Sequence, residues 1–270
     1  MVREVNIQST ETSSSIRVVR ALAWREFTGR YRDSLFGVSW TFIVPIVTLS
    51  IYGVIFSQVF SARWLKPDGR ELNYALAIFS GFLIFNVIAE ALNGSAYLIP
   101  RHAALVKRTR IKIEVIPVAF CLSIFYNFAV SSLPFFVLFL IVEGLPPPSI
   151  LLLPIVILPL ITLCAAMVFA VSSMAIFFPD LKQINALLTT AILFTSPIFF
   201  DASRLESGVA KHLSDLSPIG ILIARSKELV FYGTLSDGSS LIIVQLFAFV
   251  LLVLSRNLFQ KLAGAFADVL

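Results

Sequence analysis

Six long stretches without a charged side chain set the strongest limit on what this chain can fold into. They cover residues 35–60, 72–89, 115–142, 144–179, 183–200 and 238–255, and each holds at least 18 residues. A helix needs roughly 20 apolar residues to cross a ~30 Å hydrocarbon core, and flanking polar residues can complete the shorter stretches. The sequence therefore predicts an all-α integral membrane protein with six transmembrane helices, at about 35–60, 72–93, 115–142, 150–177, 184–201 and 238–256.

The composition excludes the main alternatives to a membrane protein. Hydrophobic residues make up 58% of the 270 residues and charged residues 14%, a proportion that one soluble domain cannot hide in its core. The two cysteines, Cys121 and Cys164, lie inside apolar stretches. That placement argues against a secreted disulfide scaffold.

The positions of Lys and Arg predict the orientation. Fourteen of the 21 lie before the first span or after the second, fourth and sixth spans. Cytoplasmic loops are the ones enriched in Lys and Arg, so both termini are predicted to be cytoplasmic. The net charge of +5 is then explained by topology and by anionic lipid headgroups, and no nucleic-acid partner is expected.

Three polar segments flank the spans. Residues 1–15 are rich in Ser and Thr and are expected to be flexible. Residues 16–34 are expected to form an amphipathic interface helix at the cytoplasmic surface, because apolar side chains recur there every three to four residues; a solvated lead-in to the first span is the alternative. Residues 259–270 are expected to be a cytoplasmic C-terminus.

Two connections are unusually long. Residues 94–114 contain Pro100 and a basic run, so they would present a short helix to a cytoplasmic partner or simply anchor the chain by charge. Residues 201–237 contain apolar pieces at 218–224 and 229–232. These pieces favour re-entrant half-helices before the last span, which protein rather than lipid would bury; a folded surface loop is the alternative.

The sequence offers little catalytic chemistry. No Gly is followed by Lys, so the chain has no P-loop and is not expected to be an enzyme by itself. No metal site is expected, because His102 and His212 fall on opposite sides of the predicted topology. Glu90 is the one acidic residue near a span interior, and its expected role is a structural charge that pairs with a basic residue.

Aromatic side chains are abundant near the predicted first and fifth spans. Ring faces pack on apolar C–H surfaces without demanding fixed hydrogen bonds, so an aromatic wall would suit an amphiphilic polymer; ordinary helix packing is the alternative. The rings expected to line such a path are Trp40, Tyr52, Phe56, Phe60, Phe194, Phe199 and Phe200.

An ordered set of short motifs resembles one known family. The segment from Arg30 to Trp40 (RYRDSLFGVSW), followed by Pro45 and Tyr52, resembles the start of ABC-2 type export permeases, in particular the branch that exports lipid-linked O-antigen, capsule and teichoic acid. The motifs FSGFLIFN, LVKR, DLKQ, SPI and FAD follow in the same order. Phe85, Pro179 and Ser217 depart from this pattern, where the family often has Trp, Arg and Asn.

The resemblance implies an ABC-2 (type V) exporter fold and a set of partners. Such permeases are homodimers with two copies of a cytoplasmic ATP-binding subunit, so ATP and Mg would bind the partner and no cofactor would bind this chain. It also implies that the interface helix and residues 95–107 contact the ATPase, and that spans one and five line the glycan path. The coupling residues would be Arg25, Arg30, Tyr97, Pro100, Arg101, His102 and Lys107.

The expected function is therefore that of the permease subunit of an ATP-driven exporter. Its substrate would be a lipid-linked polysaccharide, most simply of O-antigen type, carried across a bacterial inner membrane. The alternatives are an ABC-2 exporter of a small hydrophobic compound or drug and, from a different class, a membrane-embedded lipid or sugar transferase. An ion-coupled carrier is disfavoured because intramembrane charge is scarce.

Overall fold

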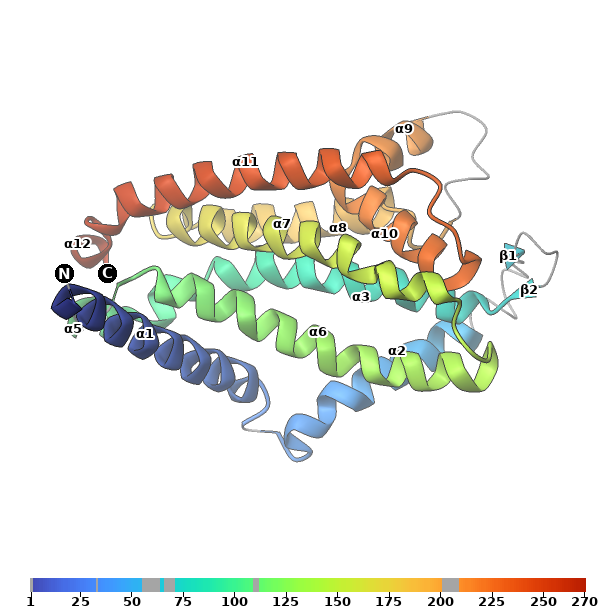
Figure 1. Cartoon of the computed structure of the whole chain (residues 1–270), viewed down its shortest axis with the longest axis horizontal. Coiled ribbons are helices and arrows are strands. Elements are labelled where there is room, and N and C mark those ends of the chain that lie inside the picture. Colours follow the sequence, from blue (N-terminus) through green and yellow to red (C-terminus); the bar gives the residue numbers. More distant parts are fainter. Residues whose placement is uncertain (1, 33, 55–63, 66–70, 109–111, 201–208) are drawn as a thin grey trace.

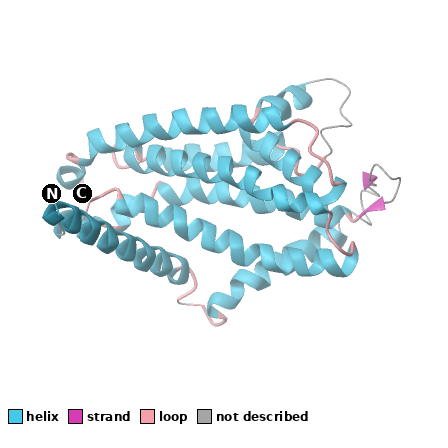
Figure 2. Ribbon diagram, viewed as in Figure 1, coloured by secondary structure: helices cyan, strands magenta, loops and turns pink. Residues whose placement is uncertain are grey.

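The computed structural model describes residues 2–32, 34–54, 64–65, 71–108, 112–200 and 209–270. Long helices lie side by side in an elongated bundle (Figure 1), and nearly the whole described chain is helical (Figure 2). Both termini lie at one end of the bundle, which we call the terminal end. The opposite end, beside the short strands β1 and β2, is called the strand end.

Helix α1 (Val2–Gly29) is longer than the sequence leads us to expect. It begins at Val2 rather than at residue 16, so residues 2–15, expected to be flexible, belong to the helix. Residues 2–28 contain neither Gly nor Pro, and nothing in this stretch breaks a helix. Leu22, Ala23 and Phe27 are buried, and α1 packs along α6. The apolar face of α1 is therefore covered in large part by protein.

Helix α2 (Trp40–Val54) begins later than the predicted first span. A short 3-10 turn, η1 (Gly37–Ser39), precedes it, and Gly37 adopts φ +50°, a conformation that favours glycine. The 15 residues of α2 extend about 22 Å at the rise of an α-helix. Beyond α2, β1 (Trp64–Leu65) and β2 (Glu71–Leu72) form an antiparallel pair.

Helix α3 (Tyr74–Ser95) lies at the centre of the bundle and is buried over most of its length. The Asn73 side chain accepts a hydrogen bond from the Leu76 N–H at 3.2 Å and so caps the first turn. Helix α3 contacts α2, α6, α7, α8 and α10. A helix enclosed by protein is apolar around most of its circumference, and α3 has that pattern.

Three further long helices complete the bundle, and two of them, α6 and α7, contact α3. They are α6 (Val115–Val142), α7 (Leu153–Met174), which follows the 3-10 turn η3 (Pro148–Leu152), and α11 (Gly238–Ala263). Helices α7 and α11 lie side by side along the bundle (Figure 1). Together with α3, they are long and apolar enough to cross a membrane, so the described residues contain four such helices.

The helices found at the first and fifth predicted spans are shorter than the other four. Helix α8 (Leu181–Thr195) has 15 residues, as α2 does. It stops at Ser196, whose extended conformation (φ −84°, ψ 149°) is the one favoured before a proline, here Pro197. Within the described residues, helix length thus supports four spans. Helix α8 is too short by itself for a ~30 Å core, and the described part of α2 ends at Val54.

The region before the last long helix is compactly folded. Helix α9 (Val209–Leu216) leads into α10 (Pro218–Lys227), which continues into a π-helical turn, η5 (Glu228–Tyr232). Ile219, Leu222 and Leu229 are buried. The two apolar pieces, expected as separate half-helices, therefore form one continuous helical segment packed against α3, α7 and α11.

The terminal end is built from short helices. Helices α4 (Leu98–Arg101) and α5 (Ala103–Arg108) follow α3, and α12 (Phe266–Val269) closes the chain. Phe259 and Phe266 are fully buried, and their ring centroids lie 5.3 Å apart. Residues 259–270, expected as a simple cytoplasmic tail, thus include the end of α11 and are anchored to the bundle.

Candidate functional site

A polar joint connects α1 to α4 at the terminal end. The imidazole Nε2 of His102 lies 3.2 Å from Oε1 of Glu26, and Nη1 of Arg101 lies 3.3 Å from Oε2 of the same carboxylate. On its other side, His102 Nδ1 lies 2.9 Å from the carbonyl oxygen of Leu98. In its protonated form the imidazole donates to both oxygens, so the buried His102 side chain joins the two helices.

The charges around this joint favour the ionised form of Glu26. Burial of the side chain opposes ionisation, but the hydrogen bond from His102 and the charges of His102, Arg101 and Arg25 outweigh that effect. The pKa of Glu26 therefore lies below its ordinary value of 4.5. At neutral pH the α1–α4 joint contains a carboxylate.

The remaining expected coupling residues are spread around the joint. Tyr97 is half exposed and its ring lies under Lys182, whose Nζ is 4.7 Å from the ring centroid. Pro100 lies within α4, and Lys107 is exposed on α5. Arg25 lines an apolar cavity between α1, α5 and α6. Arg30 lies apart from these residues, beside Glu90.

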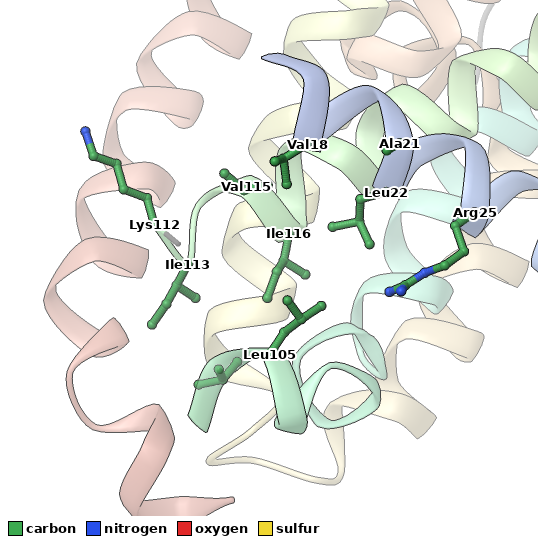
Figure 3. A pocket seen from close by; sticks show the side chains of 10 residues that line it. Val18, Ala21, Leu22, Arg25, Leu105, Lys112, Ile113, Val115 and Ile116 are labelled. Carbon is green, nitrogen blue, oxygen red and sulfur yellow. The ribbon is translucent and has the colours of Figure 1, made fainter. Parts of the chain in front are cut away.

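An apolar cavity of about 290 Å³ opens between α1, α5 and the start of α6. Leu22 of α1, Leu105 of α5 and Ile116 of α6 face one another across it (Figure 3). Arg25 and Lys112 are the basic residues of its lining. Apolar side chains bordered by cations at the terminal end form a surface suited to an amphipathic partner segment.

A second polar cluster joins the turn after α1 to the bundle interior. Arg30 forms an ion pair with Glu90 of α3, and its Nη2 donates to the Ser123 hydroxyl of α6 at 3.0 Å. The Asn127 amide donates to Glu90 Oε2 at 3.3 Å. Glu90 thus has both a cation and an amide as partners, and this network connects three segments of the chain.

A cavity of about 430 Å³ lies beside this cluster, and we call it the α2–α3–α6 cavity. Trp40 and Thr41 line it from α2, Phe82 and Glu90 from α3, and Asn127 from α6. Its lining combines rings, hydroxyls and amides. Among the described rings that were expected to line a glycan path, Trp40 belongs to this lining.

The other expected path rings lie towards the strand end or are not described. The rings of Phe194 and Phe199 stack with their centroids 6.2 Å apart. The ring of Phe199 also packs edge-on against that of Phe82, with a centroid distance of 5.7 Å. Phe82 therefore connects this aromatic group to the α2–α3–α6 cavity. Phe200 is partly buried next to Phe199 in sequence. The Tyr52 side chain, Phe56 and Phe60 lie outside the described residues.

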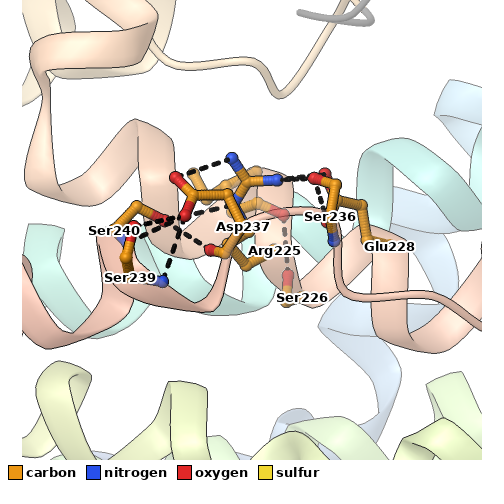
Figure 4. Close-up of polar contacts among 8 residues, drawn as sticks. Arg225, Ser226, Glu228, Ser236, Asp237, Ser239 and Ser240 are labelled. Atoms are coloured by element: carbon orange, nitrogen blue, oxygen red, sulfur yellow. Dashed lines mark hydrogen bonds and ion pairs between the residues drawn. The ribbon is translucent and has the colours of Figure 1, made fainter.

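At the strand end, Arg225 ties α10 to the start of α11 (Figure 4). Its Nη1 lies 2.5 Å from Glu228 Oε1 and also contacts the Ser236 hydroxyl, while its Nε donates to Ser240 at 3.3 Å. The Ser239 hydroxyl donates to Asp237 and, despite some desolvation, holds the pKa of that carboxyl below its ordinary value. This cluster closes the loop between η5 and α11.

Several of these partners were missed in the sequence. Glu26 is the one acidic residue between positions 12 and 32, a signal that could have marked it as the partner of a basic residue. Ser123 and Asn127 lie four apart on α6, which places two polar groups on one face of an apolar helix. Lys227, buried and donating to the Pro197 carbonyl at 2.6 Å, gave no such signal.

Comparison with known proteins identifies the family. Residues 17–226, well over half of the chain, match the profile of the ABC-2 type transporter family. The chain belongs to that family. It is therefore an ABC-2 permease, the membrane subunit of an ABC transporter that works with a partner ATP-binding subunit.

Two curated relatives extend over most of the ABC-2 permease. One is the O-antigen export system permease protein RfbA of Myxococcus xanthus, 25% identical over 92% of this chain and 93% of the relative. The other is the protein of the same name from Klebsiella pneumoniae, 25% identical over 89% of this chain and 90% of the relative. The similarity to each relative therefore extends over about nine tenths of the chain.

Proposed function

We propose that this ABC-2 permease exports a lipid-linked polysaccharide of O-antigen type across the bacterial inner membrane. The observation that carries the proposal is similarity along about nine tenths of the chain to permeases named for O-antigen export. The α2–α3–α6 cavity supports it, because rings next to hydroxyls and amides suit a sugar chain.

The proposed assembly is a homodimer of six-span subunits with two ATP-binding subunits. In this arrangement α2 and α8 supply the first and fifth spans, and their exposed apolar side chains are covered by lipid or by the second copy. Leu187 on α8 is 73% exposed, more than expected for a helix that packs only within its own subunit. Segment α9–α10–η5 would re-enter the membrane from the outer side.

The terminal end is proposed to face the cytoplasm and to receive the ATP-driven motion. Two features there support this role: the Glu26–His102 joint between α1 and α4, and the apolar cavity edged by Arg25 and Lys112. Closure of the ATP-binding dimer would push on α4 and α5, and the joint would transmit the push to α1 and then, through Arg30 and Glu90, to α3. ATP and Mg would remain on the partner.

The test is deletion of the gene in its own host, followed by complementation. We expect surface glycan to disappear while completed lipid-linked glycan accumulates inside the cell, and the tagged permease to copurify with a P-loop ATPase. Normal surface glycan with altered resistance to hydrophobic drugs would instead support the small-compound exporter. Loss of glycan without internal accumulation would support a transferase and contradict the proposal.

A further inference from the structure

The α2–α3–α6 cavity has the size and position of a ligand site rather than of a packing gap. Its volume of about 430 Å³ falls in the range of ~300–1,000 Å³ found for small-molecule sites. It follows α3 from Phe79 to Gly94, a distance of about 22 Å at the rise of an α-helix. It is therefore long enough for an extended ligand lying along α3.

One face of α3 is polar where it lines this cavity. Asn86, Glu90 and Asn93 lie at positions i, i+4 and i+7, so they share a face of an otherwise apolar helix. Asn93 donates to the Thr189 hydroxyl at 3.1 Å and Glu90 accepts from Asn127, whereas Asn86 is exposed. Packing alone does not call for an exposed amide in the middle of a central helix.

A buried hydroxyl in the wall points to a missing partner. Thr41 is 2% exposed, lines the cavity from α2, and its Oγ1 has no hydrogen-bond partner among the described residues. A buried hydroxyl left without a partner is destabilising, and proteins generally satisfy such groups. Because neighbouring side chains cover Oγ1, a ligand in the cavity would satisfy this hydroxyl after those side chains shift.

The charges of the wall define the ligand class. None of the described residues that line the cavity is Lys or Arg, and Glu90 already pairs with Arg30 at its edge. Phosphate and carboxylate groups call for cationic partners, so the site suits an uncharged ligand. Trp40 and Phe82 offer ring faces for C–H surfaces, while Thr41, Asn86 and Asn127 offer hydroxyl and amide groups.

We propose that the α2–α3–α6 cavity is a sugar-binding site that holds an uncharged, hydroxyl-rich segment of the exported glycan. Thr41, Asn86 and Asn127 are its hydrogen-bonding residues, and Trp40 and Phe82 its stacking surfaces. The inference rests on the proposed export function and deepens it. It adds spans two and three to a path that the family resemblance assigns to spans one and five.

The decisive variant is Thr41→Val, tested in the full permease with its ATPase in the natural host. Valine has nearly the shape of threonine but lacks the hydroxyl. If no ligand binds the Thr41 hydroxyl, its removal should leave the stability of the protein unchanged or raise it. If the hydroxyl binds glycan, we expect export to fall roughly fivefold, the effect of one lost hydrogen bond, with an unchanged or higher melting temperature. Thr41→Ser should retain export.

The control Thr162→Val removes a hydroxyl between α7 and α11. This hydroxyl forms hydrogen bonds with Leu158 and Gln245 outside the cavity.

A photocrosslinking measurement keeps the test independent of folding losses. p-Benzoyl-phenylalanine replaces Trp40 in one strain and Leu246, 62% exposed on α11, in another. We expect a glycan adduct, removed by periodate, at position 40 and none at position 246. Wild-type export of Thr41→Val, loss of the dimer in that variant, or no adduct at position 40 would overturn the site. If the wild-type strain itself exports no glycan, the proposed function fails instead.

Discussion

Nε2 of His102 lies 3.2 Å from Oε1 of Glu26, and this contact joins two side chains that are 76 residues apart in the chain. The His102 side chain is 4% exposed and that of Glu26 10% exposed. A contact between nearly buried polar side chains has a fixed geometry, unlike an ion pair in solvent. The joint therefore holds α1 against α4 as one unit.

The first prediction concerns transmission through this joint. Glu26→Gln removes a charge-assisted hydrogen bond, which contributes about 1.5–3 kcal/mol. We expect glycan export to fall roughly tenfold, since ~1.4 kcal/mol corresponds to a factor of ten, while the assembled complex still hydrolyses ATP. Export and ATPase rates of the same preparation check this. Arg20→Gln, at an exposed position of α1, is the control and should leave both rates unchanged. Equal losses of both rates in Glu26→Gln would point to failed assembly instead.

The second prediction concerns pH. The pKa of Glu26 is lower in the folded protein than its ordinary value of 4.5, so ionised Glu26 stabilises the fold above pH 4.5. That contribution is lost as the pH falls from 4.5 through the folded pKa, at up to about 1.4 kcal/mol per pH unit. We expect the melting temperature of wild type to drop more steeply below pH 4.5 than that of Glu26→Gln. If the melting temperatures of the two proteins fell in parallel with pH, the lowered pKa of Glu26 would be contradicted.

The third prediction concerns the pair Arg30–Glu90. The variants Arg30→Gln and Glu90→Gln and their combination form a double-mutant cycle with little change in size. We expect the double variant to lose less stability than the sum of the singles, with a coupling of about 0.5–3 kcal/mol. The exposed pair Arg256–Glu114, whose side chains are 55% and 29% exposed, is the matched control and should show under about 1 kcal/mol. Additive effects at Arg30 and Glu90 would contradict the connection between them.

The fourth prediction concerns the close approach of α9 and α10. A Cβ at Gly220 would lie 2.5 Å from the backbone oxygen of Ser214, closer than such atoms come in proteins. Gly220→Ala should therefore displace α9 and lower stability by about 1–3 kcal/mol, seen as a lower melting temperature. Gly264→Ala, where nothing lies within 4 Å of the added atom, is the control. If Gly220→Ala left the melting temperature unchanged, α9 would have to move freely against α10.

Helix positions followed closely from the sequence where the apolar stretches were long. The stretch 115–142 coincides with α6, and 238–255 lies within α11. A long charge-free stretch leaves few alternatives to a helix in the membrane, because unpaired backbone groups are costly there. The short helices were harder to predict. Gly37 delays the start of α2, and Pro197 ends the helical path of α8.

The candidate site was only partly accessible from the sequence. Arg101 and His102 were expected near an ATPase contact, but their partner Glu26 was not recognised, because helical periodicity assigns a face and not the neighbour of that face. Glu90 was expected to pair with a basic residue, and the structure identifies that residue as Arg30. Thr41 gave no signal at all, since its significance depends on what is missing around its hydroxyl.

The sequence by itself determined the class of the protein: charge-free stretches require a membrane, and ordered motifs over most of the chain indicate an ABC-2 permease. Only the tertiary structure decided which side chains meet. Glu26 contacts His102, Arg30 pairs with Glu90, and three helices line a cavity that holds both rings and polar groups. The physical reason is that hydrophobicity is a local property of each segment, whereas ion pairs and cavities depend on the positions of helices that are distant in the chain.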